Sequence, residues 1–246
     1  MNIVAIIQAR CGSTRFPNKI FAEINGKPLI WHVINRLKFS QKINRILLAT
    51  TTSPSDDKLE KWAENNEVEI YRGQENDVLN RFYEGAKLTN ADIIVRITAD
   101  DPFKEPRLID DAIGIMQSGN YDFVCNNNPP SFPEGVDVEV LTFDALSESE
   151  KESNSDFERE HVTQYIYHNL SKFKTFNLEN NENLSYLRWT IDTTQDFELV
   201  CNIYDKLDKR DGSIFHMDEI IKYINENPEV GKMNSNVPRS ELYKKI

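Results

Sequence analysis

Apolar residues in the first half of the chain alternate between a spacing typical of strands and a spacing typical of helices. Short continuous apolar runs, of the length expected for buried strands, lie at residues 3–8, 43–50, 68–71, 91–98 and 121–126. Segments with apolar side chains three or four positions apart lie at residues 28–37, 55–65, 77–88 and 106–117. Pro28 is expected in the first turn of one helix, and Ser55 is expected to cap the next. This alternation predicts an α/β fold with a mainly parallel sheet covered by helices on both faces.

The pattern changes after residue 126. A proline-rich stretch at 128–134 precedes an alternating strand at 136–143, charged helices as far as about 169, and a strand pair at 173–178 and 187–192. We interpret residues 128–190 as an insertion and returning strand within a single domain, 1–227, and not as a second domain. The last helix is expected near residues 217–225, and residues 228–246 are expected to form a polar tail.

Composition and charge narrow the class of protein. With 39% hydrophobic residues, the 246-residue chain can bury a sizeable core, which argues against general disorder. No apolar run approaches the roughly 20 residues of a membrane-spanning helix, so we expect no membrane association and a cytoplasmic protein. The net charge of −11 argues against nucleic acid as a partner. Three cysteines without close spacing indicate neither a disulfide framework nor a zinc site.

Positive charge is concentrated near the start of the chain. Residues 1–50 contain eight bases and one acid and so sum to +7, which leaves −18 for the rest of the chain. A basic region in an acidic protein favours a small anionic ligand. Chance clustering of solvated helix bases is the alternative, especially for residues 36–45.

The loop after the first strand carries three of these bases. Residues 8–19 read Gln-Ala-Arg-Cys-Gly-Ser-Thr-Arg-Phe-Pro-Asn-Lys. Gly12 permits close approach of the backbone, and Arg10, Arg15 and Lys19 can neutralise phosphate charge. The spacing is neither that of a P-loop nor Gly-x-Gly-x-x-Gly. The loop is therefore predicted to bind phosphate, with a solvated basic turn as the alternative.

Two aspartates follow expected strands. Asp100 comes after the strand at 91–98, and Asp192 ends the apolar segment 187–192. Ligands of open parallel sheets bind beyond the carboxyl ends of the strands, where these carboxylates could hold Mg²⁺ on a triphosphate. Each aspartate could instead cap a helix or begin a turn.

Several motifs together resemble those of a known family. They are residues 6–19, 25–30 (Asn-Gly-Lys-Pro-Leu-Ile), 77–81 (Asp-Val-Leu-Asn-Arg), 96–100 (Arg-Ile-Thr-Ala-Asp), 133–140 (Pro-Glu-Gly-Val-Asp-Val-Glu-Val), 159–163 (Arg-Glu-His-Val-Thr) and 187–193 (Leu-Arg-Trp-Thr-Ile-Asp-Thr). The set resembles the cytidylyltransferases that activate acidic sugars, such as the 3-deoxy-manno-octulosonate and acylneuraminate enzymes. It is most similar to the spore coat polysaccharide biosynthesis cytidylyltransferase-like family.

The resemblance implies a Rossmann-like nucleotidyltransferase fold of three layers, with a mainly parallel mixed sheet and a small inserted strand and helix region. It implies an enzyme that uses CTP, or another nucleoside triphosphate, with Mg²⁺, and that releases pyrophosphate. The implied nucleotide-binding residues are Ala9, Arg10, Gly12, Ser13, Arg15, Lys19, Asp77 and Arg81. Lys19, Arg10 and Asp100 are the implied catalytic residues, and Asp100 and Asp192 the implied metal ligands. Asp101 departs from the family pattern, so the charge at the metal site could differ, or Asp101 could face solvent.

The acceptor is expected to be an acidic or phosphorylated sugar. Its candidate binding residues are Glu134, Asp137, Glu139, Arg159, His161 and Arg188. Arg159 or Arg188 would suit an acceptor carboxylate, because guanidinium pairs with carboxylate in two parallel hydrogen bonds. His161 could act as a base or hydrogen-bond the sugar, or it could serve packing alone.

Other readings remain open at this point. Relatives that form dimers make a homodimer the expected state. One alternative is a glycosyltransferase of related fold, although such enzymes usually carry Asp-x-Asp and here Pro102 stands two residues after Asp100. The other alternative is a non-catalytic nucleotide-binding protein.

Overall fold

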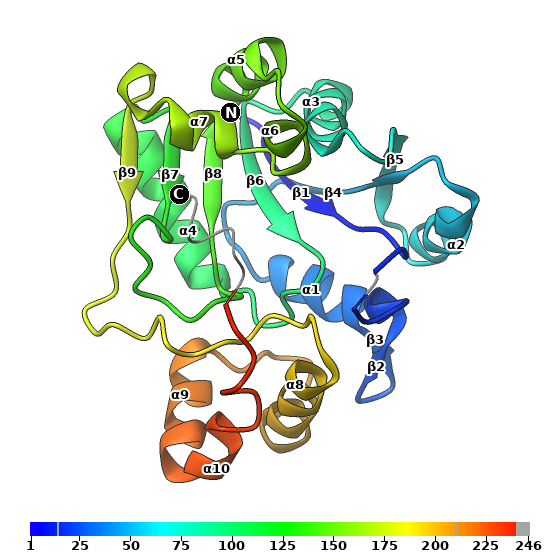
Figure 1. Cartoon of the computed structure of the whole chain (residues 1–246), viewed down its shortest axis with the longest axis vertical. Helices are drawn as coiled ribbons and strands as arrows, with labels where there is room; N and C mark the ends of the chain where they lie inside the picture. The colour runs from blue at the N-terminus through cyan, green and yellow to red at the C-terminus, as the bar shows by residue number, and fades with distance from the viewer. Residues whose placement is uncertain (14, 210, 240–246) are drawn as a thin grey trace.

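A seven-stranded sheet forms the centre of the computed structural model, which describes residues 1–13, 15–209 and 211–239 (Figure 1). Thr14 of the basic loop and the end of the polar tail, 240–246, lie outside the described residues. The strands are β1 (Ile3–Gln8), β4 (Arg45–Thr51), β5 (Glu69–Gly73), β6 (Ile93–Thr98), β7 (Phe123–Cys125), β8 (Glu139–Thr142) and β9 (Thr175–Asn177). A separate small hairpin pairs β2 (Glu23–Ile24) with β3 (Lys27–Pro28).

The strand order is β5-β4-β1-β6-β8-β7-β9. Neighbouring strands run parallel, except that β8 is antiparallel to both β6 and β7. The predicted mixed, mainly parallel sheet is therefore confirmed. From β1 the chain moves outward to β4 and β5 and then returns to β6 on the other side of β1. Loops that leave the carboxyl ends of β1 and β6 thus diverge, and ligands of open α/β sheets bind at such a reversal of strand order.

Ten helices surround the sheet within the part of the chain that the structure describes. They are α1 (Leu29–Leu37), α2 (Asp57–Asn65), α3 (Val78–Thr89), α4 (Pro106–Gly119), α5 (Phe143–Glu152), α6 (Asp156–Glu160), α7 (Gln164–His168), α8 (Thr194–Leu207), α9 (Met217–Glu226) and α10 (Pro228–Gly231). Short 3-10 turns η1 (Lys19–Phe21), η2 (Pro54–Asp56) and η3 (Leu170–Lys172) complete the regular structure. None of the described helices is long and apolar enough to cross a membrane.

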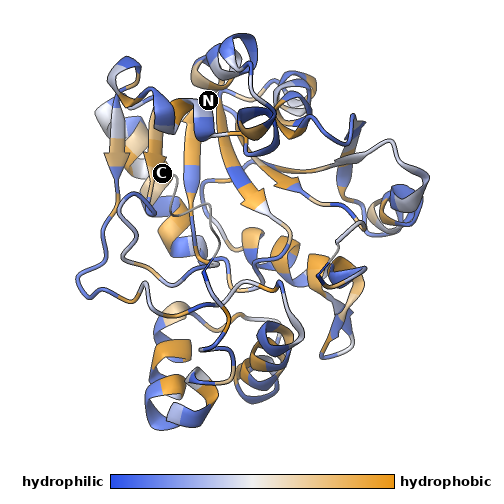
Figure 2. Ribbon diagram, in the orientation of Figure 1, coloured by the Kyte–Doolittle hydropathy of each residue, from blue (hydrophilic) through white to orange (hydrophobic). Residues whose placement is uncertain are grey.

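The continuous apolar sequence of β1 follows from burial on both of its faces. Ala5 and Ile7 lie in a core with the apolar faces of α1, α2 and α4. Val4 and Ile6 point the other way, into a second core with α3, α5 and α7. Successive side chains of a strand alternate between faces, so both sets must be apolar. Figure 2 shows the result as apolar strands between helices whose outer sides are hydrophilic.

Helices α8, α9 and α10 lie together below the sheet in Figure 1. They follow residues 187–192, where the sequence predicts a returning strand. This prediction is wrong, because the segment forms a single bridge, between Glu134 and Arg188. Trp189 and Ile191 are buried in the core shared with α8, so their apolar character reflects packing and not strand pairing. Strand β9 pairs with β7 instead.

Local details at helix starts also differ from expectation. Pro28 belongs to β3 and directly precedes α1, so it is the residue before the helix and not in its first turn. Ser55 lies inside η2, and α2 begins after Asp56. The polar tail begins with α10, and its Val230 and Asn234 are buried.

Phe82 provides a test of the second core. It lies on α3, is fully buried, and packs among apolar side chains of the sheet. Phe82→Ala should lower the free energy of unfolding by about 3–5 kcal/mol, through lost burial and a cavity. Leu88→Ala on the same helix, where the side chain is 59% exposed, should change it by less than about 0.5 kcal/mol. Urea unfolding measures both, and equal losses would contradict this account of the core.

Candidate active site

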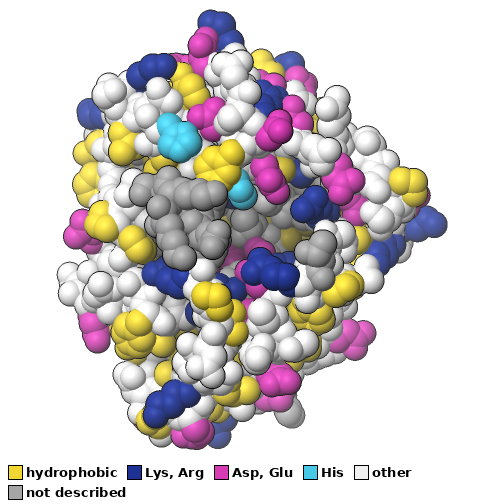
Figure 3. All heavy atoms as spheres, viewed as in Figure 1, with side chains coloured by type: hydrophobic (Ala, Val, Ile, Leu, Met, Phe, Trp, Pro, Cys, Tyr) yellow, Lys and Arg dark blue, Asp and Glu magenta, His cyan; other side chains and the backbone are white. Residues whose placement is uncertain are grey.

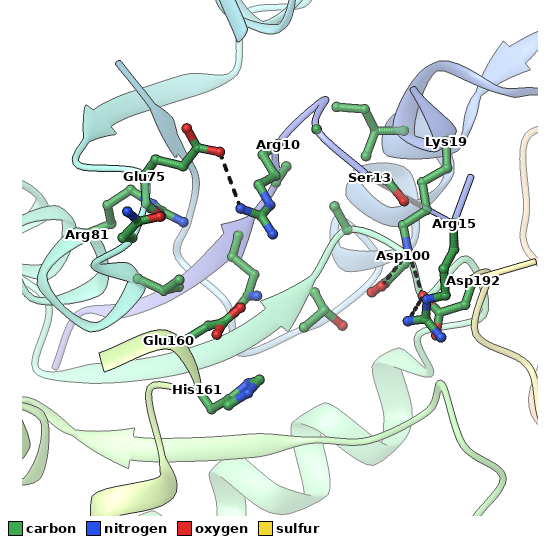
Figure 4. Close-up of a pocket in the computed structure, with 18 of the residues that line it drawn as sticks. Arg10, Ser13, Arg15, Lys19, Glu75, Arg81, Asp100, Glu160, His161 and Asp192 are labelled. Carbon is green, nitrogen blue, oxygen red and sulfur yellow. Dashed lines mark hydrogen bonds and ion pairs between the residues drawn. The ribbon is translucent and has the colours of Figure 1, made fainter. Parts of the chain in front are cut away.

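A cavity of about 540 Å³ opens beyond the carboxyl ends of β1 and β6. The loop after β1 forms one wall, with Ala9, Arg10, Gly12, Ser13, Arg15 and Lys19 among the lining residues. Glu160 and His161 lie on the opposite side, and Glu75 and Arg81 close one end (Figure 4). In the space-filling view, basic and acidic side chains lie next to one another near the centre of this face (Figure 3). The cavity is therefore polar and contains most of the residues predicted for nucleotide binding.

The loop after β1 is closed on itself. The amide of Asn18 donates to the carbonyl of Cys11 at 3.3 Å, and Asn18 adopts a left-handed conformation with φ of 58° before η1 begins. The hydroxyl of Ser13 accepts the amide of Phe16 at 3.3 Å. A Cβ on Gly12 would meet no heavy atom within 4 Å, so the space beside this backbone is open to a ligand.

Lys19 occupies the centre of the site. Its Nζ donates to Asp100 Oδ2 at 2.9 Å, to Asp192 Oδ1 at 2.9 Å and to the carbonyl of Ile191 at 2.7 Å. Burial lowers the pKa of Lys19, but the charges of Asp100 and then Asp192 outweigh burial and raise it. The same ion pair holds the pKa of Asp100 below its ordinary value, against the effect of burial. Lys19 and Asp100 are therefore both charged at neutral pH.

The two aspartates predicted as metal ligands are thus brought together on one cationic centre. Mg²⁺ is usually held in proteins by one or two carboxylates together with substrate phosphates and water. Asp100 and Asp192 fit that description, because their oxygens already converge on one positive charge. Among the described residues, no cluster of three or more His, Cys, Asp and Glu side chains could hold a metal alone. A Mg²⁺ ion held by these two carboxylates would complete its coordination with water or with the phosphate oxygens of a ligand.

Asp192 is held by three bases. Besides Lys19, Arg15 Nη2 lies 3.0 Å from Asp192 Oδ1, and Arg188 Nη2 donates to Oδ2 at 2.9 Å. The helix-cap alternative for Asp192 is wrong, because Thr193 caps α8 in a reciprocal capping box with Asp196. Asp192 therefore does not cap the helix, and it lines the cavity.

Arg188, predicted on the acceptor side, lies behind the cavity. It lines neither the large cavity nor its smaller neighbour, and its side chain is 5% exposed. Its guanidinium donates to Glu134 at 2.8 Å and to Asp196 at 3.0 Å, in addition to Asp192. Burial lowers the pKa of Arg188, but the hydrogen bond to Asp196 and the charge of Glu134 outweigh it and raise the pKa. Arg188 therefore braces Asp192 from behind.

Asn234, in the C-terminal segment, also supports Arg188 and Asp196. Its amide nitrogen donates to Asp196 Oδ1 at 2.8 Å and to the carbonyl of Arg188 at 2.9 Å. The side chain of Arg239 also approaches Glu134, with 3.5 Å between Nε and Oε2. The segment after α10 thus contacts the charged network behind the cavity.

Two basic residues shape the far end of the cavity. Arg10 is half exposed, with Nη1 3.4 Å from Glu75 Oε1. Arg81 is buried and donates to the carbonyls of Gln74 and Glu75. Burial, followed by the charge of Arg10, lowers the pKa of Arg81. Arg81 therefore orders the segment before α3 while its side chain lines the cavity.

Asp77 and Arg159 do not line the cavity. Asp77 caps α3 by accepting the amide of Asn80 at 3.0 Å. Arg159 donates to both Asp77 oxygens, at 3.0 and 2.6 Å, and so ties α6 to the start of α3. In the structure the two side chains satisfy each other, and the contacts of Asp77 with nucleotide and of Arg159 with an acceptor carboxylate stay predictions.

The remaining acceptor candidates line a smaller cavity of about 220 Å³ that adjoins the first. These are Glu134, Asp137, Glu139 and His161, and His161 lines both cavities. Glu139 is buried and already bound by Arg96, by the Thr163 hydroxyl at 3.0 Å and by the Tyr167 hydroxyl at 2.7 Å. Glu139 therefore forms part of the cavity wall, and its carboxylate is already engaged by these three side chains.

Several lining residues were missed by sequence reasoning. Gln8 and Thr98, which end β1 and β6, line both cavities, and their polar character at the end of apolar strands was the available signal.

Lys104 is buried and pairs with Asp101 at 2.8 Å. Asp101 is therefore buried and does not face solvent. Burial raises the pKa of Asp101.

Comparison with known proteins identifies the class. Residues 4–234 match the family described as cytidylyltransferase. A basic loop after β1, with one carboxylate after β6 and another just before α8, makes the site of a nucleotidyltransferase, and the chain belongs to the cytidylyltransferase family.

Two relatives share part or most of the sequence. The spore coat polysaccharide biosynthesis protein SpsF of Bacillus subtilis is 31% identical, over 93% of this chain and 96% of its own. The 3-deoxy-manno-octulosonate cytidylyltransferase of Geobacter sulfurreducens is 37% identical over 46% of this chain and 44% of its own.

Two solved structures extend the comparison. A cytidylyltransferase from Leptospira borgpetersenii superposes with a TM-score of 0.88 and 33% identity, covering 94% of this chain and 96% of its own. A CMP:2-keto-3-deoxy-manno-octonic acid synthetase complexed with CTP has a TM-score of 0.64 and 18% identity, covering 84% and 99%. At that identity the second structure shows the shared fold alone.

Removal of Arg188 tests the charged network behind Asp192. Arg188→Met leaves the buried carboxylates of Glu134 and Asp196 without their main partner, so the free energy of unfolding should fall by about 3–5 kcal/mol. Arg107→Met is the control, because its side chain is 66% exposed and lies 3.8 Å from Asp218. That change should stay within about 0.5 kcal/mol. Similar stability of both variants in chemical denaturation would refute the bracing role of Arg188.

Proposed function

We propose that this protein transfers the cytidylyl group of CTP to an acidic sugar, forming the CMP derivative and pyrophosphate with Mg²⁺. The observation that carries the proposal is the convergence of Lys19, Asp100 and Asp192 beside the open backbone of the loop after β1. The family description supports cytidylyl transfer. The names of the relatives support a sugar-acid acceptor used in polysaccharide synthesis.

The reaction is one displacement at phosphorus. An acceptor oxygen forms a bond to the α-phosphorus of CTP, while the bond from that phosphorus to the bridging oxygen of pyrophosphate breaks. The electron pair of the broken bond leaves with pyrophosphate, and the acceptor hydroxyl gives its proton to a base or to water. No protein nucleophile is required, so positioning and charge stabilisation supply the rate enhancement.

Each group in the large cavity has a role in this proposal. The amides near Gly12 and the side chains of Arg10 and Arg15 bind the triphosphate. Asp100 and Asp192 would hold Mg²⁺, which would supply positive charge to the phosphate oxygens. Lys19, which pairs with both carboxylates, would bind a phosphate oxygen of CTP.

The acceptor lies in the smaller cavity in this proposal. Asp137 and His161 are placed there by β8 and by the end of α6, next to the two metal carboxylates. His161 reaches both cavities, so it is positioned to hydrogen-bond the acceptor near the α-phosphate. A sugar with several hydroxyls suits a cavity whose walls carry carboxylates and amides.

The choice of nucleotide is the first test. Purified protein with Mg²⁺ and a panel of ulosonates, nonulosonates and sugar phosphates should release pyrophosphate with CTP, and at least tenfold more slowly with ATP, GTP or UTP. A coupled phosphate assay measures the release. Equal rates with all four nucleotides would contradict the CTP assignment, and binding of CTP without any release would favour a non-catalytic nucleotide-binding protein.

The metal assignment is the second test. Asp100→Asn removes one charge at nearly constant shape, so kcat should fall at least about 100-fold while the thermal midpoint changes little. Asp111→Asn, an exposed carboxylate on α4, is the matched control and should retain full activity. Unchanged turnover of Asp100→Asn across a Mg²⁺ titration would exclude Asp100 as a metal ligand.

A further inference from the structure

The buried carboxylate of Asp56 lies against the loop after β1, and it has no role in the proposed reaction. Asp56 ends η2, between β4 and α2, and is 1% exposed. Its Oδ1 accepts the backbone amide of Cys11 at 2.7 Å, and its Oδ2 accepts the hydroxyl of Thr51 at 2.5 Å. Asp56 does not line the large cavity, so it cannot contact a nucleotide directly.

A negative charge at this place is unfavourable on two counts. Burial of a carboxylate removes it from water, and its charge repels an anion bound on the other side of the loop. Burial acts to raise the pKa of Asp56, but the Thr51 hydroxyl and the Cys11 amide outweigh burial and hold the pKa below its ordinary value. Asp56 is therefore a charged hydrogen-bond acceptor, and its contribution at this position is its hydrogen bonds to the Cys11 amide and the Thr51 hydroxyl.

The hydrogen bond to Cys11 determines the direction of the loop. Because the amide of Cys11 points down to Asp56, the chain turns at this residue and leaves the backbone of Gly12 beside open space. The carbonyl of Cys11 points back across the loop to the amide of Asn18. Cys11 is thus fixed through both of its backbone polar groups.

The other end of the loop is held from the same segment. Lys58, two residues after Asp56, donates to the side-chain oxygen of Asn18, and its Nζ lies 5.2 Å from the centre of the Phe21 ring. Residues 56–58 therefore contact both Cys11 and Asn18, which are the two residues that close the loop. Neither contact involves the sheet or the metal carboxylates.

We propose that Asp56 is a positioning residue for nucleotide binding: it acts through the backbone of Cys11 to hold the loop in the shape that accepts the triphosphate. The inference rests on the proposed binding of CTP by this loop. Lys58 holds the opposite end of the loop in the same way. Loss of either contact weakens binding of the triphosphate and leaves the acceptor cavity as it is.

The test compares triphosphate and acceptor binding. Asp56→Ala should raise KM for CTP at least tenfold, while KM for the acceptor stays within twofold. Asp56→Asn keeps an oxygen that can accept the Cys11 amide, so it should recover most of the affinity for CTP. Asp57→Asn is the matched control: this neighbouring carboxylate pairs with Arg72 at 2.8 Å, away from the loop, and should leave KM unchanged.

Direct binding separates this inference from the proposed function. Calorimetry with CTP and with inorganic pyrophosphate needs no acceptor, and the wild-type protein should bind both. If it binds neither, the proposed function fails. If it binds both, and Asp56→Ala binds pyrophosphate as tightly as wild type, the positioning role is overturned. An equal rise in both KM values would also overturn it.

Lys58→Met is a second variant that keeps the inference testable if Asp56→Ala does not fold. Lys58 is exposed, so its loss should leave the unfolding midpoint unchanged while pyrophosphate affinity falls about threefold or more. If Asp56→Ala does not fold, Asp56→Asn and Lys58→Met decide the result. Wild-type affinity in both would then refute the inference.

Discussion

The ammonium group of Lys19 connects three parts of the chain that are far apart in sequence. Lys19 follows the first strand, Asp100 follows β6, and Asp192 precedes α8. Two carboxylates this close would repel each other, so their meeting depends on a positive charge between them. Lys19 supplies that charge. Its ion pairs therefore join the loop after β1 to the segments that follow β6 and precede α8.

The sheet makes this meeting possible. Strands β1 and β6 are parallel neighbours, with Gln8 beside Thr98, so the loops that follow them leave from the same edge. Within the seven-stranded sheet, β8 runs antiparallel to β6 and β7; it begins at that edge and brings Glu139 opposite Arg96. The segment that precedes β8 lines the smaller cavity. It thus adds a second compartment beside the central strands.

Sequence reasoning predicted the features that depend on local pattern. The strands at the centre of the sheet, the basic loop and the two cavity aspartates, Asp100 and Asp192, could all be inferred, because burial and charge are visible along one segment. Ion pairs between distant segments could not. Asp77 and Arg159 each suggested a ligand contact, but each satisfies the other. Arg188 suggested an acceptor partner but binds three carboxylates of its own chain. Segment 187–192 has the alternating apolar pattern of a strand because Leu187, Trp189 and Ile191 are buried in the core shared with α8.

The contacts of Asn234 have a consequence for the order in which the enzyme becomes competent during synthesis. This side chain bonds to Asp196 and to the backbone of Arg188, and so completes the support behind Asp192. It follows every strand of the sheet along the chain. Domains generally fold as units. The carboxylates of Asp100 and Asp192 therefore gain their full support only after the segment that follows α10 has been made. A nascent chain that ends before α10 lacks this support and also lacks the part of the core that Val230 supplies.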